Sequence, residues 1–565
     1  MFNTQSHNQE HLDQPSAMAS HDIRAGENPF HFPPGTVRLE STVHPSGHIE
    51  PHPVPTDDPN DPLNWSPWRK HLNFGLAGLF VVVAFIQVSN VYVAYTPYAA
   101  DLGLTYNQYN NCLAVNYAGL AFGSYFFMPF VHRYGRRPMY LVSLAILLAD
   151  TIWAANMRTS KEPLPVSLVG GLGGSLSESL VALTIADLYF VHQHAVMNGW
   201  FLMLQATGTS LGPVMMGYVV EGKGWRFMHW LTTIFVGVAL LGVVVLFEET
   251  LYIPRLEGVP PSQPHEIIVD KPVKPANDTT SKELSSFTND EESSFKSCHA
   301  APLAMKSSIS LKTYRQRLAF AEPVKGPFLY HFYQPLLIFS TIPGVAYSAF
   351  TYGALLAWMS VMVSAQSYFT TLPPYNLGPE TVGLLTLAPF IGTIIGSAIF
   401  PIVSDRSIIW LSKRNGGVYE PEMRLWPSIP GAFFCCAGEL IFGLCLANRK
   451  PVLTLSAGLF IYTIGFAICA DVALTYLLDS FHDILSDSLV AVALMRNLLS
   501  VIIMFTFTPW ITGLGIRDTF IMVAVLATVS LLIPIAFLIW GKQWRRSGAD
   551  KYRKYALTQV VRRES

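Results

Sequence analysis

Twelve apolar runs, each near the length needed to cross a membrane, constrain this chain more than any other feature. A transmembrane helix needs about 20 mostly apolar residues to cross a hydrocarbon core about 30 Å thick. The runs form two sets of six, at residues 72–95, 112–131, 138–157, 166–190, 198–220 and 226–248, and at 335–366, 382–403, 428–448, 453–477, 488–511 and 519–541. Only 13% of the residues are charged, against about 25% in ordinary soluble domains. The pattern predicts an all-α membrane protein with twelve transmembrane helices in two six-helix bundles.

The segments outside the runs complete the predicted domain organisation. We expect a disordered N-terminal tail at 1–71, six-helix bundles at 72–248 and 335–541, a largely disordered central loop at 249–334 and a basic tail at 542–565. The first 53 residues contain seven histidines, but their spacing matches no metal-ligand motif, so a solvated tail is favoured over a metal site. We therefore expect no bound metal.

The distribution of Lys and Arg predicts the orientation of the chain. Basic residues gather in the loops that share a side with both termini, where they include Arg69, Lys70, Arg133, Arg136, Arg137, Lys413, Arg414, Lys542, Arg545 and Arg546. The opposite side has far fewer. Because loops rich in Lys and Arg stay in the cytosol, both termini, the central loop and both tails are expected to be cytosolic. A multi-pass protein of the plasma membrane is the expected localisation.

The loop after the second run reads "HRYGRRP", at 132–138. It resembles the Gly-x-x-x-Asp-Arg-x-Gly-Arg-Arg signature of the major facilitator superfamily. Arg133, Gly135, Arg136 and Arg137 match that signature, whereas His132 stands in place of its Asp. The corresponding loop of the second half, "SDRS", keeps Asp405 and Arg406, as a duplicated ancestor would predict. An ordinary positively charged cytosolic loop is the alternative interpretation.

The fifth run contains "GTSLGPVMMG", at 208–217, although Gly and Pro are costly inside a helix. With Gly199, Gly208, Gly212, Pro213 and Gly217, the stretch resembles the fifth-span signature of proton-coupled drug antiporters. Small residues let helix backbones approach closely, and a proline frees a carbonyl group and bends the helix. We expect these residues at the seam between the two bundles.

Further stretches are similar to fungal 12-span members of this antiporter group, including "DPNDPLNWSPWRK" before the first run and "LMRNLLS" in the eleventh. The resemblance covers about 60–548. Fungal relatives include multidrug exporters, secondary-metabolite exporters and a yeast uptake branch for histidinol, polyamines and cations. The resemblance implies alternating access driven by a proton gradient, with no other cofactor. Ser167 stands where the drug antiporters usually carry an Arg tied to proton transfer.

Ionisable residues inside the runs are candidates for coupling or substrate binding, because charges at bilayer depth are costly. The candidates are Glu178, Asp150, Glu439, Asp471, Arg496 and, as a hydrogen-bonding group, Gln205. Desolvation favours the neutral form of a buried carboxyl group, which suits reversible protonation at Glu178. Asp150 and Glu439 occupy corresponding runs of the two halves. Alternatively, Asp471 and Arg496 pair with each other, and Gln205 bonds only between helices. Asp187 is expected to cap or anchor a cytosolic helix end.

These features predict a secondary active transporter rather than an enzyme, most simply a proton-coupled exporter of a drug, toxin or secondary metabolite. The near alternative is uptake of an organic cation such as a polyamine, because Glu178 and Glu439 would form a central acidic pair that favours a cationic cargo. A non-transporting receptor with a transporter fold is a remote alternative. The expected partners are a small-molecule substrate and the lipid bilayer, with the protein acting as a monomer. No basic patch interleaved with aromatic residues points to nucleic acid.

Overall fold

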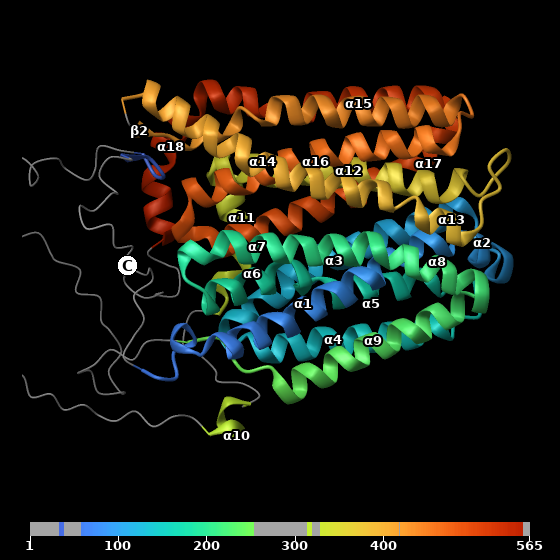
Figure 1. Ribbon diagram of the computed structural model, residues 1–565, viewed down its shortest axis with the longest axis horizontal. Coiled ribbons are helices and arrows are strands. Elements are labelled where there is room, and N and C mark those ends of the chain that lie inside the picture. The colour runs from blue at the N-terminus through green and yellow to red at the C-terminus, as the bar shows by residue number, and fades with distance from the viewer. Residues whose placement is uncertain (1–32, 39–57, 253–312, 319–327, 417, 557–565) are drawn as a thin grey trace, which may run out of the picture.

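The computed structural model describes residues 33–38, 58–252, 313–318, 328–416 and 418–556. Long helices lie side by side in two bundles, the first built from α1–α9 and the second from α11–α18 (Figure 1). The helices are α1 (Pro67–Ser89), α2 (Val91–Leu102), α3 (Tyr106–Tyr134), α4 (Arg136–Ala155), α5 (Pro163–Gly174), α6 (Leu176–Leu188), α7 (Val191–Ala206), α8 (Gly212–Lys223), α9 (Trp225–Leu246), α10 (Tyr314–Arg317), α11 (Tyr330–Thr341), α12 (Pro343–Phe369), α13 (Pro379–Leu384), α14 (Leu387–Arg414), α15 (Ser428–Ala447), α16 (Val452–Ser480), α17 (Leu485–Leu531) and α18 (Ile533–Ala556).

Short elements complete the fold. The strands β1 (Val37–Arg38) and β2 (Val418–Tyr419) pair antiparallel, and η2 (Pro62–Asn64), η4 (Pro421–Leu425) and η5 (His482–Ile484) are 3₁₀ turns. We call the end of the molecule where α1 begins and α3 passes into α4 the loop end, and the opposite end, with α2 and α13, the far end. The loop end lies on the left in Figure 1.

Nine helical segments among the described residues are long and apolar enough to cross a membrane. The last of them, 482–556, contains two predicted spans, because the chain reverses at the non-helical Gly515 within α17. The rings of Phe507 and Phe520 lie 6.3 Å apart, whereas a straight helix would separate them by about 20 Å. The helical, two-bundle membrane fold is confirmed. The count of twelve spans stays a prediction, because α3 and α7–α8 are not among the nine.

Proline and glycine residues divide several predicted spans into consecutive helices. The fifth span is the clearest case: α7 and α8 are separated by η3 (Thr207–Leu211), a π-helical turn that directly precedes Gly212 and Pro213. A proline lacks the backbone N–H that would continue the α-helical pattern. The interruption expected from the sequence is therefore present.

Each bundle has its own apolar core, and its outer helices carry apolar side chains on their exposed faces. Ile234 and Leu241 of α9, for example, are 59% and 65% exposed. Such a surface is unfavourable in water and suits contact with lipid hydrocarbon. This pattern supports a multi-pass membrane protein.

Several predicted boundaries differ from the helices. The helix α18 continues to Ala556, past the predicted end of the second bundle at 541, and α1 begins five residues before the predicted start of the first bundle. Most of the segments predicted to be disordered, 1–71 and 249–334, lie outside the described residues, as does the end of the C-terminal tail.

Candidate functional site

A buried ion pair joins the two bundles. Glu178 lies on α6 of the first bundle and Arg496 on α17 of the second, and the two side chains form a salt bridge. Only 11% of the Glu178 side chain and 7% of the Arg496 side chain are exposed. The alternative pairing of Arg496 with Asp471 is therefore wrong: the carboxylate that neutralises Arg496 comes from the opposite bundle.

Aromatic and hydroxyl groups surround Arg496. The guanidinium carbon lies 5.2 Å from the ring centroid of Tyr352, within the range of a cation–π contact. The helix α12 approaches α17 closely here, because a Cβ on Gly353 would lie only 3.1 Å from the Cα of Arg496. Across the bundle interface, the Oγ of Ser360 donates a hydrogen bond of 2.7 Å to the hydroxyl of Tyr117 on α3. These groups can both hydrogen-bond and stack on an organic molecule.

The remaining candidates of the second bundle have different surroundings. Asp471, on α16, is partly buried and lies within electrostatic reach of Tyr352. Glu439, on α15, is fully buried, and neither carboxyl oxygen has a hydrogen-bond partner among the described residues. Its helix packs against α16 and α17 inside the second bundle. Glu439 therefore does not form a central acidic pair with Glu178.

Asp150 lies on a small cavity within the first bundle. Its carboxylate accepts a hydrogen bond from the amide of Gln87 on α1, while its Oδ1 has no hydrogen-bond partner among the described residues. The cavity has a volume of about 30 Å³. Ser167 and His229 also line this cavity. Ser167, at the position where the drug antiporters usually carry an Arg, therefore lines the same cavity as the buried carboxyl group of Asp150.

Two more polar contacts surround this cavity. The hydroxyl of Tyr98 lies 2.6 Å from the Nε2 of His229, and the amide of Asn116 donates to the carbonyl of Ser167 at 3.0 Å. Tyr98 and His229 line the cavity but were not predicted from the sequence. Gln205, on α7, is partly buried, and its role as a substrate-binding group stays a prediction.

Carboxylates from distant segments hold the loop motif. The Nε of Arg136 lies 2.9 Å from the Oδ2 of Asp187, so Asp187 anchors a helix end as expected. The backbone N–H groups of Arg136 and Arg137 donate to the carboxylate of Glu249 at 2.8 and 3.0 Å. Gly135 has φ of 102°, and a Cβ there would collide with Glu249. Burial raises the pKa of Glu249, which lies beyond the end of α9.

The other loop residues divide between the two bundles. The side chain of Arg137 donates to the carbonyl of Val244 at 2.8 Å, and the guanidinium of Arg133 lies 5.1 Å from the ring of Phe328. Arg406 is exposed on α14. The side chain of Asp405, on the same helix, lies outside the described part of the structure.

Two glycines of the fifth-span motif bring α1 close. A Cβ on Gly208 would lie 2.7 Å from the carbonyl oxygen of Val82, and one on Gly212 would lie 3.1 Å from the Cγ1 of Ile86. These distances leave no room for a side chain at Gly208 and little at Gly212. The close backbone approach expected from the sequence is present.

The same motif contacts the opposite bundle. A Cβ on Gly217 would lie 2.6 Å from the carbonyl oxygen of Pro379, and the hydroxyl of Thr386 donates to the carbonyl of Ser210 at 2.6 Å. The motif therefore lies at the seam between the bundles. Gly199 differs, because a Cβ there would meet no atom within 4 Å.

Comparisons with known proteins agree with this arrangement. A family model described as Major Facilitator Superfamily matches residues 77–498. An uncharacterized MFS-type transporter of Schizosaccharomyces pombe is 26% identical, covering 92% of this chain and 94% of its own, and Protein HOL1 of Saccharomyces cerevisiae is 26% identical, covering 87% and 90%. Efflux pump radE of Floropilus chiversii is 23% identical, covering 86% and 83%. The crystal structure of a D-xylose-proton symporter shares the fold, with a TM-score of 0.55 at 13% identity, covering 82% of this chain and 97% of its own.

Proposed function

Because this chain belongs to the major facilitator superfamily, we propose that it is a secondary active transporter that exports an organic small molecule in exchange for protons. Transport proceeds by alternating access, with the two bundles rocking about a central site. The protein works in the plasma membrane with both termini in the cytosol. The cargo is a drug, toxin or secondary metabolite.

The ion pair between Glu178 and Arg496 is the main observation that supports the proposed proton coupling. The bundles separate at this level only if the pair breaks, and breaking a buried pair while both groups stay charged is costly. A proton on Glu178 removes the attraction and permits separation. Arg496 also contacts Tyr352 of its own bundle, so it stays with the second bundle when the pair breaks. Protonated Glu178 then moves away with the first bundle.

Export is favoured over uptake by the fifth-span motif at the seam and by relatives such as the efflux pump named above. Neutralisation of Glu178 by Arg496 also weakens the argument for a cationic cargo, because this carboxylate already has a cationic partner.

Uptake of an organic cation remains the second candidate, and Asp471 is the observation that favours it. This carboxylate is partly exposed within electrostatic reach of Tyr352, and no ion pair to it is found among the described residues. A carboxylate and an aromatic ring that face the same site suit an ammonium group.

The direction of transport is tested in cells with and without the gene by measuring the accumulation of candidate compounds. Export predicts that deletion raises intracellular levels and sensitivity to the cargo. If deletion instead lowers uptake and leaves resistance unchanged, export is wrong and the second candidate is supported.

The coupling is tested with Glu178→Gln in the same cells. We expect this variant to lose the pH dependence of transport. The matched control is Asp101→Asn, which removes a carboxylate from an exposed ion pair with Arg226. Full pH-dependent transport by Glu178→Gln would remove Glu178 from the coupling role.

A further inference from the structure

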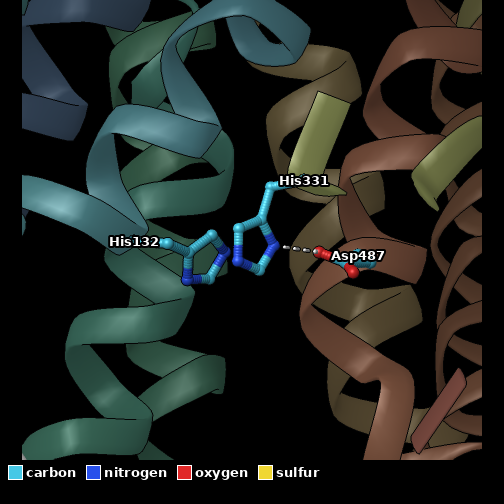
Figure 2. A group of neighbouring side chains, drawn as sticks. All are labelled: His132, His331 and Asp487. Carbon is cyan, nitrogen blue, oxygen red and sulfur yellow. Dashed lines mark ion pairs between the residues drawn. The ribbon is translucent and has the colours of Figure 1, made fainter. Parts of the chain in front are cut away.

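Three side chains with metal-binding chemistry meet between the bundles at the loop end. His132 lies in the last turn of α3, in the first bundle, whereas His331 lies on α11 and Asp487 in the first turn of α17, in the second bundle. Figure 2 shows His331 between the other two side chains. The cluster therefore depends on both bundles.

The three groups are close and largely buried. The Nδ1 of His331 lies 3.8 Å from the Oδ1 of Asp487, and the rings of His132 and His331 stack with centroids 4.8 Å apart. One possible ligand atom from each residue lies within 4.8 Å of those of the other two. His331 is 8% exposed and Asp487 1%, and the Nδ1 of His331 has no hydrogen-bond partner among the described residues.

This set of donors suits a transition-metal cation of the Zn²⁺ class. Zinc binds imidazole nitrogen and carboxylate oxygen at about 2.0–2.2 Å, and three protein ligands plus water are a common arrangement. Bonds of that length place tetrahedral ligand atoms about 3.4 Å apart. The ligand atoms must therefore approach one another by at most about 1.4 Å, which side-chain rotation can supply if the two rings unstack.

We propose that His132, His331 and Asp487 bind one Zn²⁺-class cation, which links the two bundles at the loop end. The bound ion restrains separation of the bundles at this end, so it slows the alternation on which transport depends. The proposal departs from the expectation, drawn from the sequence alone, that no metal is bound. The fifth-span motif and the Glu178–Arg496 pair take no part in it.

The test measures metal binding by the purified full-length protein carrying no polyhistidine tag. After chelation of residual metal, Co²⁺ and Zn²⁺ are titrated, and bound metal, the visible absorption of tetrahedral Co²⁺ and the thermal midpoint are followed. We expect His132→Ala and Asp487→Asn each to bind one equivalent fewer than the wild type, to lose the Co²⁺ band and to lose the metal-induced rise in midpoint. Because even changes around the ligands cost 10–100-fold in affinity, losing a ligand should weaken this site by more than about 100-fold.

The matched control is His482→Ala. His482 is 76% exposed and pairs with Asp483 at the same end of the molecule, outside the cluster. It should bind metal like the wild type, and the histidines of the N-terminal tail contribute equally to every variant. Equal stoichiometry and equal midpoint shifts in the wild type and His132→Ala would overturn the proposal. If Asp487→Asn fails to fold, the half-buried His132 decides the test, with its midpoint in chelator verifying the fold.

Discussion

The backbone of Gly217 lies directly against that of Pro379, where a methyl group on the glycine would come within 2.6 Å of the proline carbonyl oxygen. A second glycine, Gly383 on α13, meets the carbonyl of Pro213 on α8 just as closely. Two glycines, one from each bundle, thus allow α8 and α13 to touch at the far end. Closure of this end depends on the absence of side chains at both positions.

Gly217→Ala is therefore expected to favour conformations in which the far end is open. Overpacking of this kind costs about 1–3 kcal/mol, which would shift the equilibrium by about 5–150-fold. The measurement is the rate at which a membrane-impermeant maleimide labels a cysteine introduced at Ser210, which is buried beside Thr386 in the closed seam. Labelling should be faster when Gly217→Ala is present.

Gly222→Ala, in the same helix, is the matched control. A Cβ at Gly222 would meet no atom within 4 Å, so labelling should match that of the parent protein. Equal labelling rates in the parent and Gly217→Ala would show that the glycine contact does not hold the far end closed.

The Glu178–Arg496 pair predicts strong coupling in a double-mutant cycle. Either Glu178→Gln or Arg496→Gln leaves one buried charge unpaired, which typically costs about 3–5 kcal/mol of stability. The double variant removes both charges and should recover at least about 1 kcal/mol of that loss. Denaturant titration of the purified protein in detergent measures the free energies of unfolding of the wild type, the two single variants and the double variant.

The exposed pair of Arg226 and Asp101 provides the comparison for this cycle. Both side chains are nearly half exposed, so solvent screening limits the coupling to about 0–1 kcal/mol. A coupling no larger at Glu178 and Arg496 than at this surface pair would contradict a central role for the buried pair.

The two-bundle fold could be predicted because the length of an apolar run is itself a physical constraint set by the membrane. The seam position of Gly217 could also be predicted, since glycine and proline in a buried helix require a nearby backbone. The partner of Arg496 could not. Asp471 was a natural choice because its span adjoins that of Arg496 in sequence, whereas Glu178 comes from the other half of the chain.

Equivalent positions in the two halves did not predict equivalent surroundings either. Asp150 accepts a hydrogen bond from Gln87 and borders a cavity, whereas Glu439 has no hydrogen-bond partner among the described residues. The face of a helix that borders a cavity is set by the neighbouring helices, and the local sequence does not show which helices these are. The carboxylate of Glu249, which contacts the loop motif from more than 100 residues away, was missed for the same reason.

The space beside Asp150 predicts a selective effect of Gly170→Ala. A Cβ at Gly170 would lie 2.9 Å from the Oδ2 of Asp150, so the carboxylate must shift and its contact with Gln87 is disturbed. We expect a loss of about 1–3 kcal/mol. The thermal midpoint and unfolding free energy of the purified protein report it.

Gly174→Ala tests whether that loss is specific, since the residue ends the same helix and its nearest contact would be an ordinary 3.5 Å. Because alanine favours a helix over glycine by up to about 1 kcal/mol, this variant should be neutral or slightly stabilising. Equal losses in the two variants would show that the effect does not arise at Asp150.

Glu249 predicts a pH dependence of stability. Burial is the largest influence on this carboxyl group and raises its pKa, although hydrogen bonds from the backbone of Leu251 and Arg136 partly oppose the rise. Because the folded pKa lies above the unfolded value of about 4.3, the stabilising contribution is complete below that pH and is lost as the pH rises through the folded pKa. Glu249→Gln stays neutral, so its stability relative to the wild type should improve as the pH rises above about 4.3. Unfolding midpoints measured between about pH 4 and 8 report how the stability difference between Glu249→Gln and the wild type changes with pH. The control is Glu221→Gln at an exposed position, which should follow the wild type. Parallel profiles for Glu249→Gln and the wild type would contradict the prediction.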